Sequence, residues 1–114
     1  MVDTHVLYSN DFGIGFYWIQ KGSVQKKFIQ LIFRDTGLSL NSNELAMFIK
    51  NTKAALKRSA SCSSCKLKAE CKSILLETPA SQVSFAMNIE ELIAVEDLLK
   101  GVQFTIALEK LLDL

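Results

Sequence analysis

All three cysteines of the 114-residue chain lie in one short segment, SCSSCKLKAEC, at residues 61–71. Cys62 and Cys65 are separated by two residues, a spacing at which a short turn can direct two thiolates toward one tetrahedral metal ion. Cys71 can supply a third sulfur, and the neighbouring lysines favour the thiolate form because a cation stabilises the anion. The segment therefore indicates a zinc site, an iron–sulfur cluster or thiol redox chemistry.

A closed metal site needs a fourth ligand, and the chain has no fourth cysteine. His5, which is the only histidine, Glu70 or a water molecule would have to complete the coordination. Three alternatives remain open: a bound zinc ion or cluster, a disulfide within the segment, and three thiols that bind nothing. We favour the last of these, and we expect the protein to fold without a metal.

Positive charge is concentrated around the same segment, although the net charge of the chain is only +1. Residues 1–72 contain eleven Lys and Arg against five Asp and Glu, whereas residues 73–114 contain two against seven. Such a field can attract nucleic acid or the acidic part of a second copy. The run lacks interleaved aromatic residues that would stack on bases, so nucleic-acid binding is expected to be weak. Its basic residues are Lys50, Lys53, Lys57, Arg58, Lys66, Lys68 and Lys72.

No other group of residues is typical of a catalytic site. His5 lies close to the N-terminus, in an end of the kind that is often unstructured. Gly13 and Gly15 form only a fragment of a phosphate-binding loop. Glu90 and Glu91 are adjacent on a predicted helix, so their side chains diverge and do not meet at one substrate. We therefore expect a protein that is not an enzyme.

Length and composition predict one folded domain. A chain of 114 residues has room for one hydrophobic core, and 49% apolar with 22% charged residues is typical of a compact protein. The N-terminus lacks the features of a signal peptide, and no stretch approaches about 18 consecutive apolar residues. We expect a cytoplasmic protein that does not enter a membrane. It is predicted to be a single α+β domain over residues 1–114, with halves 12–58 and 73–114 joined by the segment 59–72.

The first half of the chain predicts three strands and a helix. Residues 13–20 and 26–33 are rich in aromatic and β-branched residues, and turn residues between them predict an antiparallel pair. A short strand is predicted over residues 38–40. Asn41 or the serine after it can cap a helix that we predict over residues 42–57.

The second half repeats this order. Two strands, predicted at residues 73–77 and 82–87, precede a capping Asn88 and a second helix. Glu91 in that helix stands where the first half has Glu44. The repetition predicts two ββα units that share one antiparallel sheet, with the two main helices packed on one face. The predicted fold class is therefore α+β with a ββα pseudo-repeat.

The runs GSVQKKFIQLIFRDTGLSLNSNEL and ILLETPASQVSFAMNIEELIAVEDLL together resemble a family of small bacterial proteins known only as a domain of unknown function. The resemblance extends from Gly22 to the C-terminus and implies no activity. Members of that family carry a Cys-x-x-Cys pair just ahead of the IQL strand, where this chain has Ser23 and Lys26. A metal or thiol role for the cysteine cluster therefore does not follow from the resemblance.

The final helix, predicted over residues 89–114, is the feature that points to a partner. Its apolar stripe is wider than one small sheet can cover, because Ala94, Leu98, Leu108, Leu111 and Leu112 extend it. We expect a second copy to cover it in a homodimer or larger assembly. The alternative is a helix buried deeply within an apolar monomer. The stripe consists of Leu92, Val95, Leu99, Val102 and Ile106.

These observations favour a non-enzymatic, self-associating interaction module without a cofactor. The alternative function is a thiolate metal-binding or redox protein that uses the cysteine cluster. Weak nucleic-acid binding through the basic residues at 50–72 ranks third.

Overall fold

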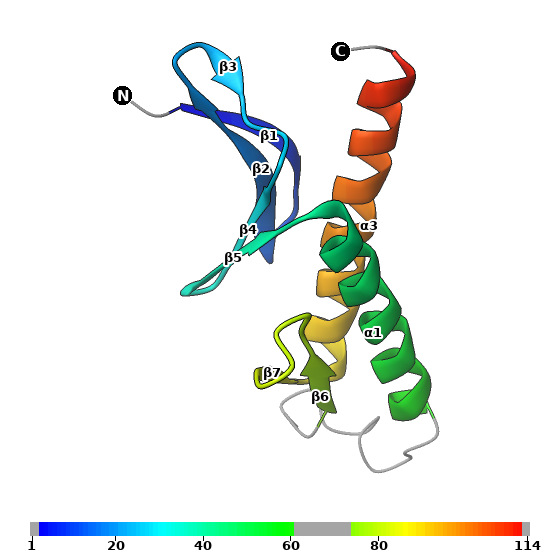
Figure 1. Ribbon diagram of the computed structural model, residues 1–114. Helices are drawn as coiled ribbons and strands as arrows, with labels where there is room; N and C mark the ends of the chain where they lie inside the picture. Colours follow the sequence, from blue (N-terminus) through cyan, green and yellow to red (C-terminus); the bar gives the residue numbers. More distant parts are fainter. Residues whose placement is uncertain (1–2, 61–73, 113–114) are drawn as a thin grey trace.

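The computed structural model describes residues 3–112 with the exception of 61–73. Both helices lie on the same side of the large sheet (Figure 1). The α+β class, with antiparallel strands and two main helices, is thus confirmed. The elements are β1 (Asp3–Ser9), β2 (Gly13–Gln20), β3 (Ser23–Val24), β4 (Ile29–Phe33), β5 (Thr36–Leu40), α1 (Ser42–Ala60), β6 (Ile74–Glu77), β7 (Ser84–Met87) and α3 (Ile89–Leu111).

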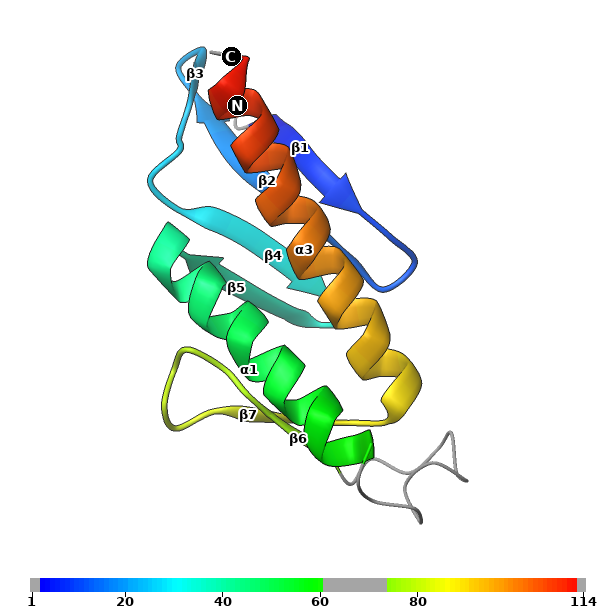
Figure 2. The same ribbon diagram turned by 90° about the vertical axis from the view of Figure 1, so that its right-hand side faces the viewer.

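Among the described residues, the strands form two separate antiparallel sheets (Figure 2). The larger sheet has the order β1-β2-β4-β5, and the short β3 pairs with β2. The other sheet contains β6 and β7 alone, so the two predicted ββα units do not share one sheet. The sheets meet through side chains instead of backbone hydrogen bonds: the ring of Phe85 on β7 packs against Phe33 on β4, with centroids 5.2 Å apart.

The edge strand β1 was not expected from the sequence, and it corrects the assignment of His5 to an unstructured end. His5 pairs with Tyr17 and Val6 pairs with Phe16 across the antiparallel β1–β2 ladder. Alternation along the strand directs His5 toward the helices and Val6 away from them. The register then shifts between Val6 and Tyr8, where the strand carries a bulge.

Each helix begins with the same capping box. The side chain of Asn41 accepts a hydrogen bond from the backbone N–H of Glu44 at 2.8 Å, and the Glu44 carboxylate accepts one from Asn41 at 2.9 Å. Asn88 and Glu91 repeat this pair at 2.8 and 3.0 Å. Each box satisfies two backbone N–H groups that the helix itself leaves unpaired. The order hairpin, capping Asn, helix therefore occurs twice, in β4–β5–α1 and in β6–β7–α3.

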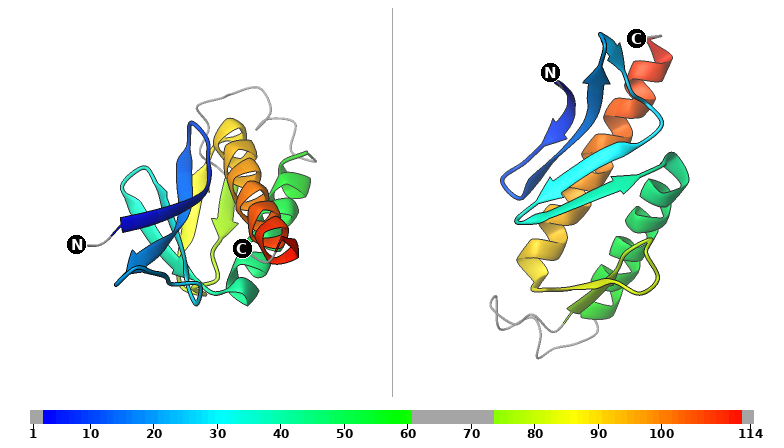
Figure 3. Two further views of the ribbon diagram at one scale, coloured as in Figure 1. Left: turned by 90° about the horizontal axis from the view of Figure 1, so that it is seen from above. Right: turned by 60° about the vertical axis from the view of Figure 1, so that its left-hand side comes forward.

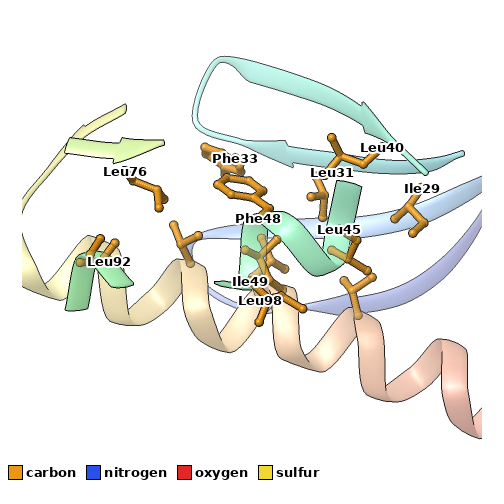
Figure 4. Close-up of a cluster of buried hydrophobic side chains, with 14 of the residues drawn as sticks. Ile29, Leu31, Phe33, Leu40, Leu45, Phe48, Ile49, Leu76, Leu92 and Leu98 are labelled. Atoms are coloured by element: carbon orange, nitrogen blue, oxygen red, sulfur yellow. The ribbon is translucent and has the colours of Figure 1, made fainter. Parts of the chain in front are cut away.

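One cluster of buried side chains joins both helices to both sheets. Figure 4 shows side chains from β4, β5, α1 and α3 directed into it. Leu76 on β6 belongs to the same cluster and has no exposed surface. The helices also contact each other, while α3 contacts β1 and β2, and α1 contacts β5 and β6. The position of α3 is therefore determined by both the large sheet and α1.

Two glycines allow α3 to lie very close to the large sheet. A Cβ atom at Gly15 on β2 would lie 2.3 Å from Cγ2 of Val102, and one at Gly101 would lie 2.3 Å from Cδ2 of Tyr8. The Tyr8 hydroxyl donates a hydrogen bond to Asp97 at 2.9 Å. Ring and hydroxyl of Tyr8 thus both anchor β1 to the middle of α3.

Candidate functional site

The predicted interface residues of α3 belong to the protein's own core. Leu92, Val95, Leu99 and Val102 have no exposed surface, and Ile106 packs at the edge of the same cluster. The prediction that this stripe meets a second copy is therefore wrong. One chain covers it because α3 packs against α1 as well as against the sheet.

A different apolar surface of α3 is exposed near its C-terminal end. Phe104 is 68% exposed and Leu111 is 81% exposed, and Leu108 and Leu112 are exposed beside them. Spacings of three and four residues place these side chains on neighbouring turns of one helix face. We call these four residues the C-terminal stripe. Within the part of the chain that the structure describes, no element covers it.

A groove of about 210 Å³ runs beside the C-terminal stripe, between α3 and the first turn of α1. Ala107 borders this groove and is one turn away from the exposed Leu111. The apolar surface of the stripe therefore continues into the groove. The groove is lined by the apolar side chains of Leu45, Ile106 and Ala107 and by the polar side chains of Ser42, Gln103 and Lys110.

His5, Tyr17 and Glu109 meet at the same end of α3. His5 Nε2 lies 2.8 Å from Glu109 Oε2, and the imidazole stacks on the Tyr17 ring with centroids 6.3 Å apart. Burial, and then the charge of Glu109, raise the pKa of Tyr17 above its ordinary value, so this hydroxyl stays protonated at neutral pH.

The contacts among these three residues hold β1 and β2 against the end of α3. The pocket that Tyr17 and Glu109 line measures about 70 Å³, which is room for about two water molecules. The His5–Glu109 pair connects β1 to the last turns of α3 and so holds the end of the helix that carries the C-terminal stripe. The arrangement can orient a surface for binding.

The predicted basic residues on α1 are exposed. Lys50, Lys53 and Lys57 point to solvent, and Arg58 donates a hydrogen bond to the backbone carbonyl of Leu75 at 2.9 Å. The described residues thus include a basic face on α1. The other predicted members of the run, Lys66, Lys68 and Lys72, lie outside the described residues.

The cysteine cluster also falls outside the described residues. Because Cys62, Cys65 and Cys71 are not among the residues that the structure describes, the metal and redox alternatives stay predictions. Among residues 3–60 and 74–112, no three His, Cys, Asp or Glu side chains are grouped so that they could hold a metal ion.

Comparison with known proteins places no constraint on the activity, because no family model, curated protein or solved structure matches the chain. Neither of the two described helices is long and apolar enough to cross a membrane.

Phe104 is the member of the C-terminal stripe that sequence reasoning missed. The three leucines of the stripe were expected to widen an apolar surface, but their direction was not predicted. The sequence does contain a signal for this surface: Phe104, Leu108 and Leu111 are spaced by four and three residues, which places them on one face of a helix. The stripe that begins at Leu92 has the same regular spacing, so spacing alone does not show which of the two stripes is buried.

Proposed function

We propose that the protein is a non-enzymatic interaction module that associates with a second copy of itself through the C-terminal stripe. The observation that carries this proposal is the exposure of four large apolar side chains side by side on α3. Their exposed fractions correspond to roughly 400 Å² of apolar surface, which is within the range of the largest patches on monomeric proteins, and such patches are often functional.

A second copy suits this surface because the stripe contains no charged residue. Two stripes can therefore pack against each other about a two-fold axis without burying a charge from either stripe. The groove beside each stripe can receive an aromatic anchor such as Phe104 from the other copy, an arrangement that is typical of interface hot spots.

The size of the surface predicts a modest affinity. The two stripes together bury roughly 800 Å² and the groove walls add to this, so the interface lies near the lower limit of about 1,200 Å² for specific complexes. We expect dissociation constants in the micromolar range, because association also loses translational and rotational freedom.

Sedimentation velocity across a concentration series from about 1 to 200 μM tests the proposal. Wild-type protein should shift from monomer to dimer across this range. Phe104→Glu should remain a monomer throughout, because it places a charge within the apolar interface. Ile93→Glu is the matched control: Ile93 is 54% exposed on the same helix but lies three turns away from Phe104. It should dimerise like the wild type.

Circular dichroism should show that both variants keep the wild-type fold, because both substitutions are at exposed positions. Two results would contradict the proposal. One is a wild-type protein that is monomeric at the highest concentration. The other is a Phe104→Glu variant that dimerises as strongly as the Ile93→Glu control.

A further inference from the structure

At the described strand positions, the face of the large sheet that points away from the helices carries aromatic and apolar side chains and no carboxylate. Figures 1 and 3 show both helices on the opposite side of this sheet. The strand registers align Val6, Phe16 and Gln30 across it, and alternation brings Trp18 to the same side. The outward positions of β1, β2, β4 and β5 include no acidic residue.

A pocket of about 240 Å³ opens on this face, where β2 approaches the start of β4. Two aromatic rings, three amides and one ammonium group line it. Nζ of Lys27 lies 5.6 Å from the centroid of the Phe28 ring, so the cation and one aromatic wall are adjacent. The lining residues are Trp18, Gln20, Gln25, Lys27, Phe28 and Gln30.

The fold holds the walls of this pocket in place. The Trp18 ring packs edge-on against Phe16, with centroids 4.9 Å apart and an angle of 84° between the rings. Phe16 itself is only 4% exposed, so it is a firm support. The backbone N–H of Gln25 donates to the carbonyl of Trp18 at 2.8 Å, and the Gln30 amide donates to the Ser39 hydroxyl at 3.1 Å. The pocket is therefore largely formed before a ligand arrives.

We infer that this pocket binds a base of a single-stranded nucleic acid. Trp18 and Phe28 offer rings on which any base can stack. Glutamine amides both donate and accept hydrogen bonds, as the edges of bases require. Lys27 stands beside the rings, where it can pair with a backbone phosphate.

The charge of this face and the volume of the pocket both favour a base of a single strand as the ligand. The outward strand positions carry no carboxylate, and Lys27 in the pocket and Lys21 in the neighbouring turn add positive charge, so this face attracts an anion. The volume is below the range of about 300–1,000 Å³ in which drug-sized ligands bind, so one base enters while the rest of the strand follows the surface. A base can reach such a pocket only from an unpaired strand, because duplex bases are stacked and paired.

Trp18 is the only tryptophan of the chain, so its fluorescence reports directly on the pocket. The titrant is an oligothymidylate of about ten nucleotides, which forms no duplex, and a duplex of the same length serves as the comparison. The single strand should quench Trp18, and its affinity should fall as salt is raised from about 50 to 200 mM. The duplex should produce little quenching.

Variants separate this pocket from the basic face of α1. Phe28→Ala should weaken binding of the single strand about tenfold, since stacking on one ring contributes a factor of about 5 to 150. Lys27→Glu should weaken it about as much, because it replaces the cation that pairs with a phosphate by a carboxylate. Lys53→Glu changes the charge on α1 by the same amount and should leave the affinity unchanged. Trp18→Ala, assayed by the anisotropy of a labelled oligonucleotide, should weaken binding by at least the same factor. If Trp18→Ala fails to fold, Phe28→Ala provides the test, because Phe28 is 41% exposed and its removal leaves the core intact.

Three results would overturn the inference. The first is the absence of quenching by the single strand at about 50 mM salt. The second is loss of binding in Lys53→Glu together with retention in Lys27→Glu, which would assign binding to α1. The third is that thymidine monophosphate binds as tightly as the oligonucleotide, which would identify a free nucleotide as the ligand.

Discussion

Replacing Gly101 by alanine sets helix propensity against the packing of α3 on β1. Gly101 lies in the interior of α3, where alanine is more favourable than glycine by about 1 kcal/mol. The added Cβ atom would lie 2.3 Å from Cδ2 and 2.5 Å from Cε2 of Tyr8, so the ring must move. Overpacking of this kind costs about 1–3 kcal/mol. Displacement of the ring also weakens the hydrogen bond from Tyr8 to Asp97.

The packing loss exceeds the gain in helix propensity, so Gly101→Ala should lower the free energy of unfolding by about 1–2 kcal/mol. Urea unfolding followed by Trp18 fluorescence measures this change. With a dependence on urea of about 1–3 kcal/mol per molar, the midpoint should fall by about 1 M.

The same substitution made in two other backgrounds isolates the ring. In Tyr8→Ala the ring is absent, so Gly101→Ala should raise the free energy of unfolding by about 1 kcal/mol, and the effect changes sign. In Tyr8→Phe the ring remains while the hydroxyl is gone, so Gly101→Ala should still destabilise. A stabilising effect in the wild-type background, or equal effects in all three backgrounds, would refute the contact between Tyr8 and Gly101.

Four further results are expected. Leu99→Ala removes a fully buried side chain and should lower the free energy of unfolding in urea by about 2–5 kcal/mol, without changing the subunit number of the protein that stays folded. Asn88→Ala removes the capping box of α3 and should lower it by about 1 kcal/mol, whereas Asn88→Ser should lower it less because serine also caps. The pKa of Tyr17, through burial and Glu109, and the pKa of Tyr8, through its hydrogen bond to Asp97, are raised above the ordinary 10.0; ultraviolet titration should therefore detect ionisation only above that value. On alkalinisation, tyrosines of the unfolded chain lose their protons before those of the folded chain. The stability that the two protonated tyrosines contribute is therefore complete below about pH 10 and declines as the pH rises through their folded-state pKa values. The decline should be smaller in a double Tyr→Phe variant. A variant with all three cysteines replaced by serine should fold, and a chelator should leave thermal unfolding of the wild type unchanged; loss of folding in either experiment would favour a structural metal site.

Local sequence signals predicted most elements because the interactions that form those elements are also local. The aromatic and β-branched run at residues 13–20 coincides with β2, and Asn88 caps α3 through the Glu91 that follows it. The strand β1 escaped prediction because Asp3, Thr4 and His5 make its first half polar. It forms because pairing with β2 and contacts with α3 supply interactions that the segment lacks on its own.

The surfaces of the molecule could not be predicted in the same way. The helix α3 is apolar around most of its circumference, so periodicity alone does not decide which side meets the sheet. That choice depends on close contacts between distant residues, such as Val102 on Gly15 and Gly101 against Tyr8. The pocket on the sheet likewise requires Phe28 to lie beside Trp18, which follows from the pairing of β2 with β4.

The two proposed surfaces can act together because they face in different directions. Ile106 packs toward the core, and Phe104 and Leu108 are each two residues from it, which places them about 200° around the helix and away from the sheet. In each copy the outer face of the large sheet lies on the side opposite the helices (Figure 3), so a dimer formed through the C-terminal stripe would leave that face accessible. Two base pockets in one dimer can engage the same strand when it is long enough to reach both, and the second contact then forms at a high effective concentration. If both proposals hold, weak self-association and a weak single pocket would together suffice for firm binding of a long single strand, whereas a short strand would be held by one pocket alone.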